Sequence, residues 1–191
     1  MLTEKRVLEI FQETGVLLEG HFLLTSGRHS NAYLQCARVF QYPQYAEELC
    51  GALAETFKAA NVDLCIGPAL GGVVIAYETA RALGVRGLFA ERDKDGTMAL
   101  RRGFVIQPGE RVLVLEDVVT TGGSVKEVLE LVGNMGGNVA GVGTIVDRSG
   151  GSVDFGVPYS SLIRLEVVSH QPADCPLCQA GIPAVKPGSR K

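Results

Sequence analysis

The chain has 191 residues, of which 46% are hydrophobic and 20% charged, and its formal net charge is −3 at pH 7. This length predicts one globular domain with a substantial core, and the weakly negative charge argues against a nucleic-acid-binding protein. No apolar run reaches membrane-spanning length, the N-terminal MLTEKRVLEIFQ lacks a signal-peptide core, and the cysteines number five, so we expect reduced thiols in a cytoplasm.

The first predicted elements are a helix and a hairpin. Residues 3–14 carry apolar side chains at helical spacing, and Gly15 follows them as a stop. Residues 22–24 and 33–35 are predicted as two short strands around a polar turn at 26–31. Taken alone, this segment indicates no more than a peripheral hairpin.

Helices and short buried strands then alternate. Residues 45–60 carry the clearest helical pattern, with apolar or aromatic residues recurring on one face. A buried strand is predicted at 62–67 and a helix at 73–83. The turn between them, GPALGG at 67–72, is rich in glycine, and such turns are common between strands and helices.

A polar and charged segment, AERDKDGTMALRR at 90–102, follows a short strand that closes with Leu88 and Phe89. Its composition predicts a mobile loop or ribbon on the surface. A solvated hairpin tip fits the spacing equally well, so the segment by itself indicates no function.

The stretch VLVLEDVVTTGGS, residues 112–124, is the most informative part of the sequence. Its four leading apolar residues predict a buried parallel strand, which we expect to end at Glu116 and Asp117. The Thr/Gly/Ser segment predicts a tight loop into a helix, because apolar residues at i, i+3, i+4 and i+7 follow it. Glycines admit close backbone approach and a helix N-terminus favours negative charge, so this loop predicts an anion site.

Two carboxylates beside an anion site would repel the anion, unless the ligand also offers hydroxyl groups or a metal ion. A sugar phosphate has both hydroxyls and a phosphate, with its hydroxyls on Glu116 and Asp117 and its phosphate in the loop from Thr120 to Ser124. The loop is not a Walker A motif, since Ser124 rather than a lysine follows Gly123. A solvated acidic turn after a core strand is the simpler alternative.

A further strand is predicted at 139–146, and it ends in Asp147 and Arg148. Ligands bind outside the carboxyl ends of strands in open α/β sheets, and the planar fork of an arginine suits a carboxylate. Arg148 is therefore a candidate carboxylate reader, with a merely solvated arginine as the alternative.

Residues 162–168 are predicted as the last strand, and Cys175-Pro-Leu-Cys178 follows it. This motif is similar to one half of a zinc site, but a structural zinc needs four ligands and the chain has no second cysteine pair of this kind. His170 or a symmetry-related copy of the motif could supply the rest. A pair of structural or incidental thiols is the favoured interpretation, so no metal ligand is assigned, and Lys186 to Lys191 form a polar tail.

The 112–124 stretch resembles the phosphoribosyl-pyrophosphate (PRPP) signature of type I phosphoribosyltransferases. From Phe22 to about Val168 the chain resembles the orotate phosphoribosyltransferase family, whose N-terminal hood carries an SGR-x-S turn before aromatic residues. The resemblance implies an α/β fold with an open, mainly parallel sheet, flanking helices and a small N-terminal hood.

A single phosphoribosyltransferase domain at 1–191 follows from this resemblance. Its hood would span about 16–40, its core about 43–150, and its C-terminal return and tail 151–191. The family often carries a lysine where this chain has Thr25 and another where it has Gly71, and its usual loop histidine is absent here.

The resemblance also implies roles for individual residues. The PRPP-binding residues would be Ala69, Leu70, Gly71, Lys94, Glu116, Asp117, Val118, Val119, Thr120, Thr121, Gly122, Gly123 and Ser124. The orotate-binding residues would be Tyr33, Thr120 and Arg148. The catalytic residues would be Arg92, Lys94 and Asp117, with the loop that holds Arg92 and Lys94 closing over the neighbouring subunit's site.

The implied reaction converts orotate and PRPP into orotidine 5′-phosphate and diphosphate, in the pathway of de novo pyrimidine biosynthesis. Mg²⁺, held mainly through PRPP, would be the cofactor, and the enzyme would be a cytoplasmic homodimer without nucleic-acid or membrane partners. Two alternatives stay open: a purine or uracil phosphoribosyltransferase, and a regulator that binds PRPP on the same scaffold.

Overall fold

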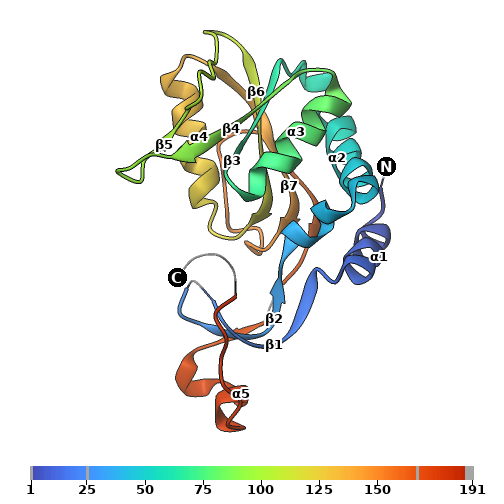
Figure 1. Ribbon diagram of the computed structural model, residues 1–191, viewed down its shortest axis with the longest axis vertical. Helices are drawn as coiled ribbons and strands as arrows, with labels where there is room; N and C mark the ends of the chain where they lie inside the picture. Colours follow the sequence, from blue (N-terminus) through green and yellow to red (C-terminus); the bar gives the residue numbers. More distant parts are fainter. Residues whose placement is uncertain (1, 25, 167, 188–191) are drawn as a thin grey trace.

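Two β-sheets organise the chain, a six-stranded sheet in the core and a three-stranded sheet in a hood beside it (Figure 1). The computed structural model describes residues 2–24, 26–166 and 168–187. The described helices and strands are α1 (Glu4–Thr14), β1 (Leu17–Leu23), β2 (His29–Leu34), α2 (Pro43–Phe57), β3 (Leu64–Pro68), α3 (Gly71–Leu83), β4 (Arg86–Arg92), β5 (Met98–Ala99), β6 (Arg111–Val119), α4 (Gly123–Asn134), β7 (Asn138–Asp147), β8 (Tyr159–Arg164), β9 (Ser169–His170) and α5 (Pro176–Gln179). The short 3-10 helices are η1 (Cys36–Gln41), η2 (Lys58–Ala60) and η3 (Pro172–Asp174).

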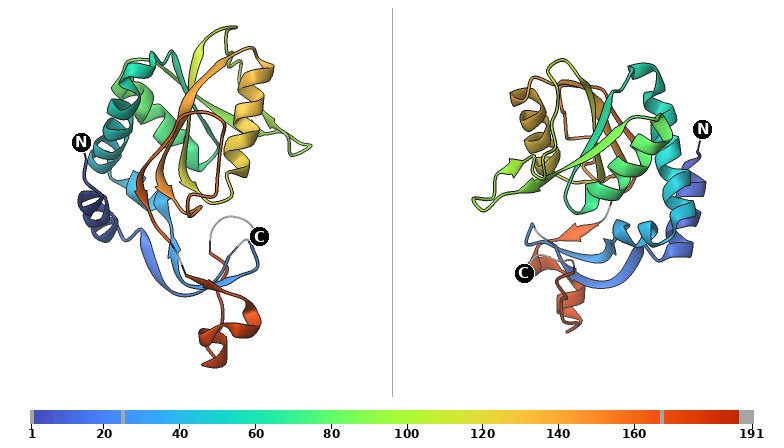
Figure 2. Two further views of the ribbon diagram at one scale, coloured as in Figure 1. Left: turned by 180° about the vertical axis from the view of Figure 1, so that it is seen from behind. Right: turned by 45° about the horizontal axis from the view of Figure 1, so that its top comes forward.

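The core sheet has the strand order β5-β4-β3-β6-β7-β8, and its strands are parallel except for β5, which runs antiparallel to β4. Helices α2 and α3 cover one face of this sheet and α4 covers the other (Figures 1 and 2). Burial on both faces explains the nearly continuous apolar runs in its central strands. The predicted open, mainly parallel sheet with flanking helices is confirmed.

Alternate side chains of β6 pack into the two faces of the sheet. Leu113 and Leu115 join the cluster on the α2 and α3 side, whereas Val112 and Val114 join the cluster on the α4 side. All four side chains are fully buried. Each burial of this kind stabilises the fold by roughly 1.5–3 kcal/mol, so the strand that leads to the two acids is held firmly on both faces.

Local signals account for the helix ends. The Thr3 side chain accepts the N–H of Arg6 at 3.3 Å, and Gly15 ends α1 with a φ of 63°, as its predicted stop requires. The helix predicted at 45–60 begins earlier, at Pro43, because proline fits the first turn of a helix. Its last three residues form η2.

The hood is built from both ends of the described chain. β1 and β2 form an antiparallel hairpin, and β9 pairs with the other edge of β2. On the free edge of β1, the Val185 N–H donates to the His21 carbonyl at 2.8 Å and the Leu23 N–H donates to the Val185 carbonyl at 2.9 Å. The C-terminal segment, predicted as a return and tail, thus joins the hood, while residues 188–191 lie outside the described residues.

The hairpin strands are longer than predicted. β1 starts at Leu17 and β2 at His29, so the turn is shorter than the expected 26–31. A register shift between Glu19 and Phe22 marks a β-bulge, which breaks the two-residue alternation from which a strand is recognised. This bulge is the physical reason for the missed beginning of β1.

The strand predicted at 162–168 is confirmed only over its first three residues and is wrong beyond them, because the chain then leaves the core sheet. β8 ends the core sheet at Arg164, and β9 begins in the hood at Ser169. Residue 167 of the predicted strand lies outside the described residues. The segment at 90–102 is a ribbon, as one of its two interpretations predicted, since β4 continues to Arg92 and pairs with β5. Among the described helices, none is long and apolar enough to cross a membrane.

Candidate active site

The carboxyl ends of three adjacent strands meet at one edge of the core sheet. β3 leads into the turn at 69–70, β6 into the loop at 120–122, and β7 into Arg148. Parallel pairing makes these loops neighbours although they lie far apart in the sequence, and this edge is where open α/β sheets bind ligands. The hood lies on this side of the core (Figure 1).

The turn between β3 and α3 is packed backbone against backbone. A Cβ on Gly67 would lie 2.3 Å from the carbonyl oxygen of Gly72, so a side chain cannot fit there. α3 then begins at Gly71 without a side-chain cap, which leaves its first N–H groups without intrahelical acceptors. With Ala69 and Leu70 exposed at the tip, this turn has the features of an anion site.

Gly71 lies directly against the central acids. A Cβ at this position would lie 2.7 Å from Oδ1 of Asp117, so the lysine that the family often carries here would require Asp117 to move. The predicted diphosphate loop and the predicted ribose-binding carboxylate are therefore in contact.

The two acids do not end the strand as expected. β6 continues past Glu116 and Asp117 to Val119, because β7 pairs with it that far. β3, in contrast, pairs with β6 only as far as Val114. One edge of the last residues of β6 stays in the sheet, and the other edge opens towards α3.

At this open edge the carboxyl groups of Glu116 and Asp117 interact. The Asp117 N–H donates to Oε1 of Glu116 at 3.1 Å, and the Val118 N–H donates to Oδ1 of Asp117 at 2.9 Å. Burial raises the pKa of Asp117, and its hydrogen bonds with Glu116 and Val118 oppose that rise. A carboxylate with so little solvation is well suited to bind ligand hydroxyls.

The side chains of Val118 and Val119 pack into the two core clusters. These two residues, predicted to bind PRPP, can therefore offer a ligand only their backbone groups. Their side chains hold the acids and the loop at a fixed separation.

The loop after β6 has the features of a phosphate site. Thr120, Thr121 and Gly123 are exposed, and α4 starts at Gly123 without a side-chain cap, so its first N–H groups lack intrahelical acceptors. Gly122 turns the chain with a φ of 73°, and a Cβ there would lie 2.8 Å from the ring of Phe155. Glycine is thus required twice over at this position, by conformation and by space.

Arg148 and Tyr33 lie within electrostatic range of each other, and Tyr33 also lies within range of Asp117. The charges of Arg148, Asp117 and Cys36 all influence the pKa of Tyr33, which burial raises. Burial lowers the pKa of Arg148, and its Nε is buried without a hydrogen-bond partner among the described residues. A buried guanidinium nitrogen without a partner indicates a position that a ligand fills.

The ion pair of Asp147 is made with Arg164, at 3.7 Å, rather than with its neighbour Arg148. Asp147 also accepts the N–H of Ser149 at 2.8 Å. Arg148 is thereby left to face the hood, where the hairpin brings Tyr33.

The candidate cations Arg92 and Lys94 lie on the β4–β5 ribbon, which projects from the core beside α4 (Figures 1 and 2). Asp93 holds the tip of the ribbon, since its carboxylate accepts the N–H groups of residues 95 and 97 at 3.0 and 3.1 Å. Arg92 pairs with Glu127 of α4 at 2.7 Å, and Lys94 is exposed. Arg92 is the last residue of β4, at the carboxyl edge of the sheet, and Lys94 lies beyond it in the ribbon.

Two residues near these groups were not recognised as candidates in the sequence analysis. Cys36 lies within electrostatic range of Asp117, Glu116 and Arg148, and its burial raises its pKa well above the ordinary value. Glu127 is the partner of Arg92. Neither had a recognisable signal, because a lone cysteine and a helical glutamate are common. Thr25, where the family often has a lysine, lies outside the described residues.

The family model of the phosphoribosyl transferase domain matches residues 37–175 of the chain. The match spans the core sheet, both glycine turns and the central acids. The chain therefore belongs to the phosphoribosyltransferase family, the class that the sheet and its strand-end loops define.

Within this family, its relatives are orotate phosphoribosyltransferases. The chain is 62% identical to that of Pelotomaculum thermopropionicum over 190 residues, and 60% identical to that of Caldanaerobacter subterraneus subsp. tengcongensis over 190 residues, with 100% of each chain covered in both cases. The resemblance stated from the sequence is confirmed.

Solved structures agree with this assignment. The crystal structure of orotate phosphoribosyltransferase from Aeropyrum pernix superposes with a TM-score of 0.68 and 27% identity, covering 83% of this chain and 93% of that chain. An adenine phosphoribosyltransferase from Thermoanaerobacter pseudethanolicus reaches a TM-score of 0.58 at 20% identity, covering 70% and 88%. The second likeness shows the shared fold alone.

Proposed function

We propose that this protein is an orotate phosphoribosyltransferase that transfers the 5-phosphoribosyl group of PRPP to orotate, with release of diphosphate, in pyrimidine biosynthesis. The observation that carries the choice of base is the buried, unpartnered Nε of Arg148 beside Tyr33. Orotate is a pyrimidine with a carboxylate, and a guanidinium fork is the natural partner of a carboxylate.

PRPP would lie along the strand-end edge. Its 5′-phosphate would accept hydrogen bonds from the loop at 120–124, where α4 begins uncapped. Its ribose hydroxyls would donate to Glu116 and Asp117. The diphosphate would then face the backbone of Ala69, Leu70 and Gly71, which contacts Asp117 from the other side.

Orotate would bind between the hood and the core. Arg148 would hold its carboxylate, the Tyr33 ring would lie against the pyrimidine, and Thr120 would border both substrates. This arrangement aims the pyrimidine nitrogen at the anomeric carbon of the ribose.

In the transfer, the bond from C1 of the ribose to the diphosphate oxygen breaks, and its electron pair leaves with the diphosphate. Positive charge develops on the ribose, the pyrimidine N1 attacks C1 to form the new bond, and the proton of N1 leaves to the diphosphate or to solvent. The protein forms no covalent bond with either substrate. It contributes by holding the reactants in line and stabilising the departing charge.

Mg²⁺ fits this site, because the carboxylate oxygens of Glu116 and Asp117 lie beside the diphosphate turn and hard cations prefer oxygen ligands. The ion would neutralise charge on the diphosphate and would be held mainly through PRPP.

We also propose that the enzyme is a cytoplasmic homodimer. The projecting β4–β5 ribbon supports the dimer. The ribbon that carries Arg92 and Lys94 projects from the core beside α4 (Figure 2), so its charges would reach the diphosphate of a second copy. Closure of that ribbon would also exclude water, which competes with orotate for the ribose.

The test is turnover of PRPP and Mg²⁺ with orotate, beside parallel reactions with uracil, hypoxanthine and adenine. We expect turnover of orotate. Preferential turnover of another base would favour a different phosphoribosyltransferase, and binding of PRPP without turnover of any base would favour a regulator.

An Arg148 variant tests orotate binding separately from PRPP binding. Arg148→Ala should raise KM for orotate and lower kcat/KM for orotate, while KM for PRPP changes little. The loss of transition-state stabilisation should be about 2 kcal/mol or more, the scale of a lost charge-assisted contact. The matched control is Arg81→Ala, an exposed arginine of α3 that pairs with Glu47 and Glu78. Full orotate activity in Arg148→Ala would overturn the proposed role of this residue.

A further inference from the structure

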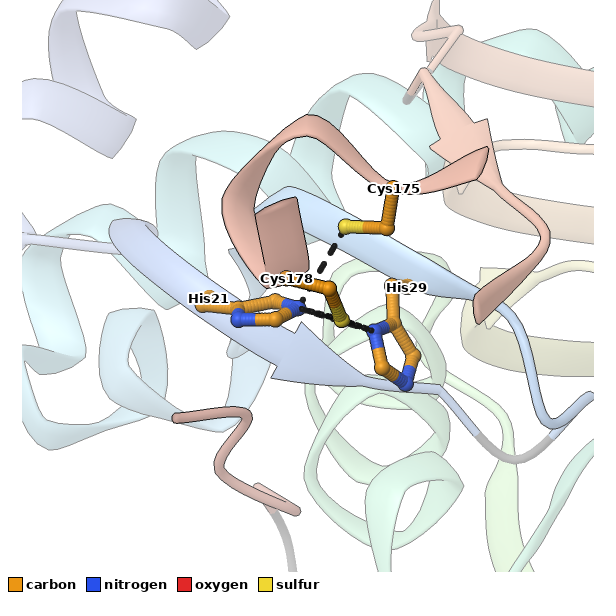
Figure 3. A group of neighbouring side chains, drawn as sticks. All are labelled: His21, His29, Cys175 and Cys178. Atoms are coloured by element: carbon orange, nitrogen blue, oxygen red, sulfur yellow. Dashed lines mark hydrogen bonds between the residues drawn. The ribbon is translucent and has the colours of Figure 1, made fainter. Parts of the chain in front are cut away.

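Four potential metal ligands converge in the hood, away from the strand-end site (Figure 3). His21 comes from β1, His29 from β2, and Cys175 and Cys178 flank the start of α5. Their ligand atoms all lie within 4.8 Å of one another.

The register of the hairpin brings the two histidines together. Leu23 pairs with His29 and Phe22 with Ser30, and the bulge between Glu19 and Phe22 places Gly20 and His21 together against Asn31, two positions from His29. Residues two apart on a strand share a face, and diagonal cross-strand neighbours on one face are within reach of each other. Both imidazoles therefore project from the same face of the hairpin, towards α5 (Figure 3).

Hydrogen bonding orients His21 as a ligand. Its Nδ1 lies 2.6 Å from the carbonyl oxygen of Ile182, which can only accept, so Nδ1 carries the proton. Nε2 is then left with a lone pair that points into the cluster. A backbone carbonyl on the far nitrogen is the usual support of a metal-bound histidine.

The distances between ligand atoms fit one tetrahedral ion. Ordinary zinc bond lengths predict about 3.3 Å between two nitrogens and about 3.5 Å between a nitrogen and a sulfur. Nε2 of His21 and Nδ1 of His29 are 2.8 Å apart, Sγ of Cys175 lies 3.4 Å from Nε2 of His21, and Sγ of Cys178 lies 3.8 and 3.2 Å from the two nitrogens. These four distances are within about half an ångström of the values for a zinc site, and every pair of ligand atoms lies within 4.8 Å.

Direct hydrogen bonds explain the cluster less well. The contact between the two histidines can be one hydrogen bond, donated by His29 to His21, but two thiols are weak donors and would add little. His21, His29 and Cys175 are also buried, at 4%, 9% and 1% exposure. Convergence of four nitrogen and sulfur donor groups on one point, three of them buried, is the pattern of a closed structural zinc site.

We propose that His21, His29, Cys175 and Cys178 bind one Zn²⁺, which fastens the C-terminal segment to the hairpin of the hood. All four positions of a tetrahedral ion are taken by protein atoms, so the metal has no open position for substrate. This interpretation replaces the thiol pair that the sequence favoured. The second pair of ligands is histidine, and it includes His21 and His29 rather than His170.

Metal binding in the hood would also affect the substrate site. The hairpin that the metal would hold also carries Tyr33, which reaches the strand-end edge beside Arg148. Metal loss should loosen the hood and raise KM for orotate more than KM for PRPP. The exposed Cys178 gives a chelator or an entering ion access to the site.

The test begins with the whole chain, produced without a metal-binding tag and purified under reducing conditions. Elemental analysis should find about one zinc per chain, and replacement by Co²⁺ should give the intense visible absorption of a tetrahedral thiolate site. Removal of zinc with a chelator should lower Tm, and added Zn²⁺ should restore it.

Variants assign the ligands. Cys178→Ser and His29→Ala should lose the zinc or the cobalt spectrum, whereas His170→Ala should keep both, although His170 pairs with His29 in the sheet. If a variant fails to fold, titration of zinc-free wild-type chain against a coloured chelator still decides the matter. No zinc uptake in that titration, stoichiometric iron in its place, or a cobalt spectrum unchanged in Cys178→Ser would each overturn the proposal.

Discussion

Gly122 illustrates how a missing side chain shapes the phosphate loop. Its φ of 73° disfavours any L side chain, and a Cβ would also lie 2.8 Å from Phe155. Strain and overpacking should combine, so we expect Gly122→Ala to lower the free energy of unfolding by roughly 2–4 kcal/mol. Urea denaturation measures this change, and KM for PRPP should rise in parallel.

Gly109→Ala is the matched control. Gly109 has a φ of 86°, and a Cβ added there would have no atom within 4 Å, so its substitution introduces strain without a clash. Equal losses of unfolding free energy in both variants would show that the clash with Phe155 adds nothing to the destabilisation.

Asp117 makes the stability of the fold depend on pH. Burial raises the pKa of its carboxyl, so the folded chain holds this proton to a higher pH than the unfolded chain does. Stability therefore falls as pH rises from the ordinary carboxyl value towards the raised one. Asp117→Asn should remove this loss: the variant should be more stable than wild type at neutral pH, and the gain should disappear in acid, while activity is lost.

Urea denaturation at a series of pH values checks this prediction, with Glu130→Gln on the exposed face of α4 as the control. A variant that is less stable than wild type at neutral pH would contradict it, and would show that the Asp117 carboxylate is stabilised rather than strained by its surroundings.

At the scale of elements, an ion pair joins the β4–β5 ribbon to α4 of the same chain. Arg92 and Glu127 make a bidentate contact, with distances of 2.7 and 3.0 Å, and about two-fifths of each side chain is exposed. Such a pair contributes at most about 1 kcal/mol to stability, so it can be released when the ribbon closes.

We therefore expect Glu127→Gln to leave the free energy of unfolding nearly unchanged, within about 1 kcal/mol, and to lower KM for PRPP, because Arg92 becomes available. Steady-state kinetics beside Glu130→Gln on the same helix measures the effect. A rise in KM specific to Glu127→Gln would mean that the ion pair positions the ribbon for catalysis instead of restraining it.

The helices and core strands could be predicted because their signals are local. Thr3 and Gly15 mark both ends of α1, and the apolar run before Glu116 marks a buried strand. The end of β6 could not be predicted, since it depends on β7 pairing further along than β3 does. The bulge after Glu19 and the change of sheet after Arg164 are also decided by partners distant in sequence.

The same limit applies to the sites. Glu116, Asp117 and the following loop lie in one motif and were recognisable from it. His29 and Cys178 are separated by 149 positions, and only the folded hairpin brings their ligand atoms together. No spacing rule connects two histidines on a hairpin with a cysteine pair at the other end of the chain.

At the scale of the whole molecule, the ribbon predicts active sites that are shared between chains. Lys94→Ala alone should lose at least about 2 kcal/mol of transition-state stabilisation, and Asp117→Asn alone should be inactive. After the two variants are mixed and allowed to exchange subunits, each mixed dimer has one site with both residues intact.

Random exchange should restore about a quarter of the wild-type activity, since half the dimers are mixed and each has one working site. The control mixes each variant with itself and should show no gain in activity. Failure to recover activity, despite exchange verified by mass spectrometry, would place Lys94 in its own subunit's site or outside catalysis.

The hood, made from both ends of the chain, also affects the order in which the protein can fold during synthesis. The core strands through β8 are complete before the segment at 169–185 is made, whereas β2 then still has an unpaired edge awaiting β9. A nascent chain could thus form the proposed phosphate loop while the hairpin proposed to bind the pyrimidine remained exposed to aggregation. Release from the ribosome, rather than formation of the core, would then be the step that completes the enzyme.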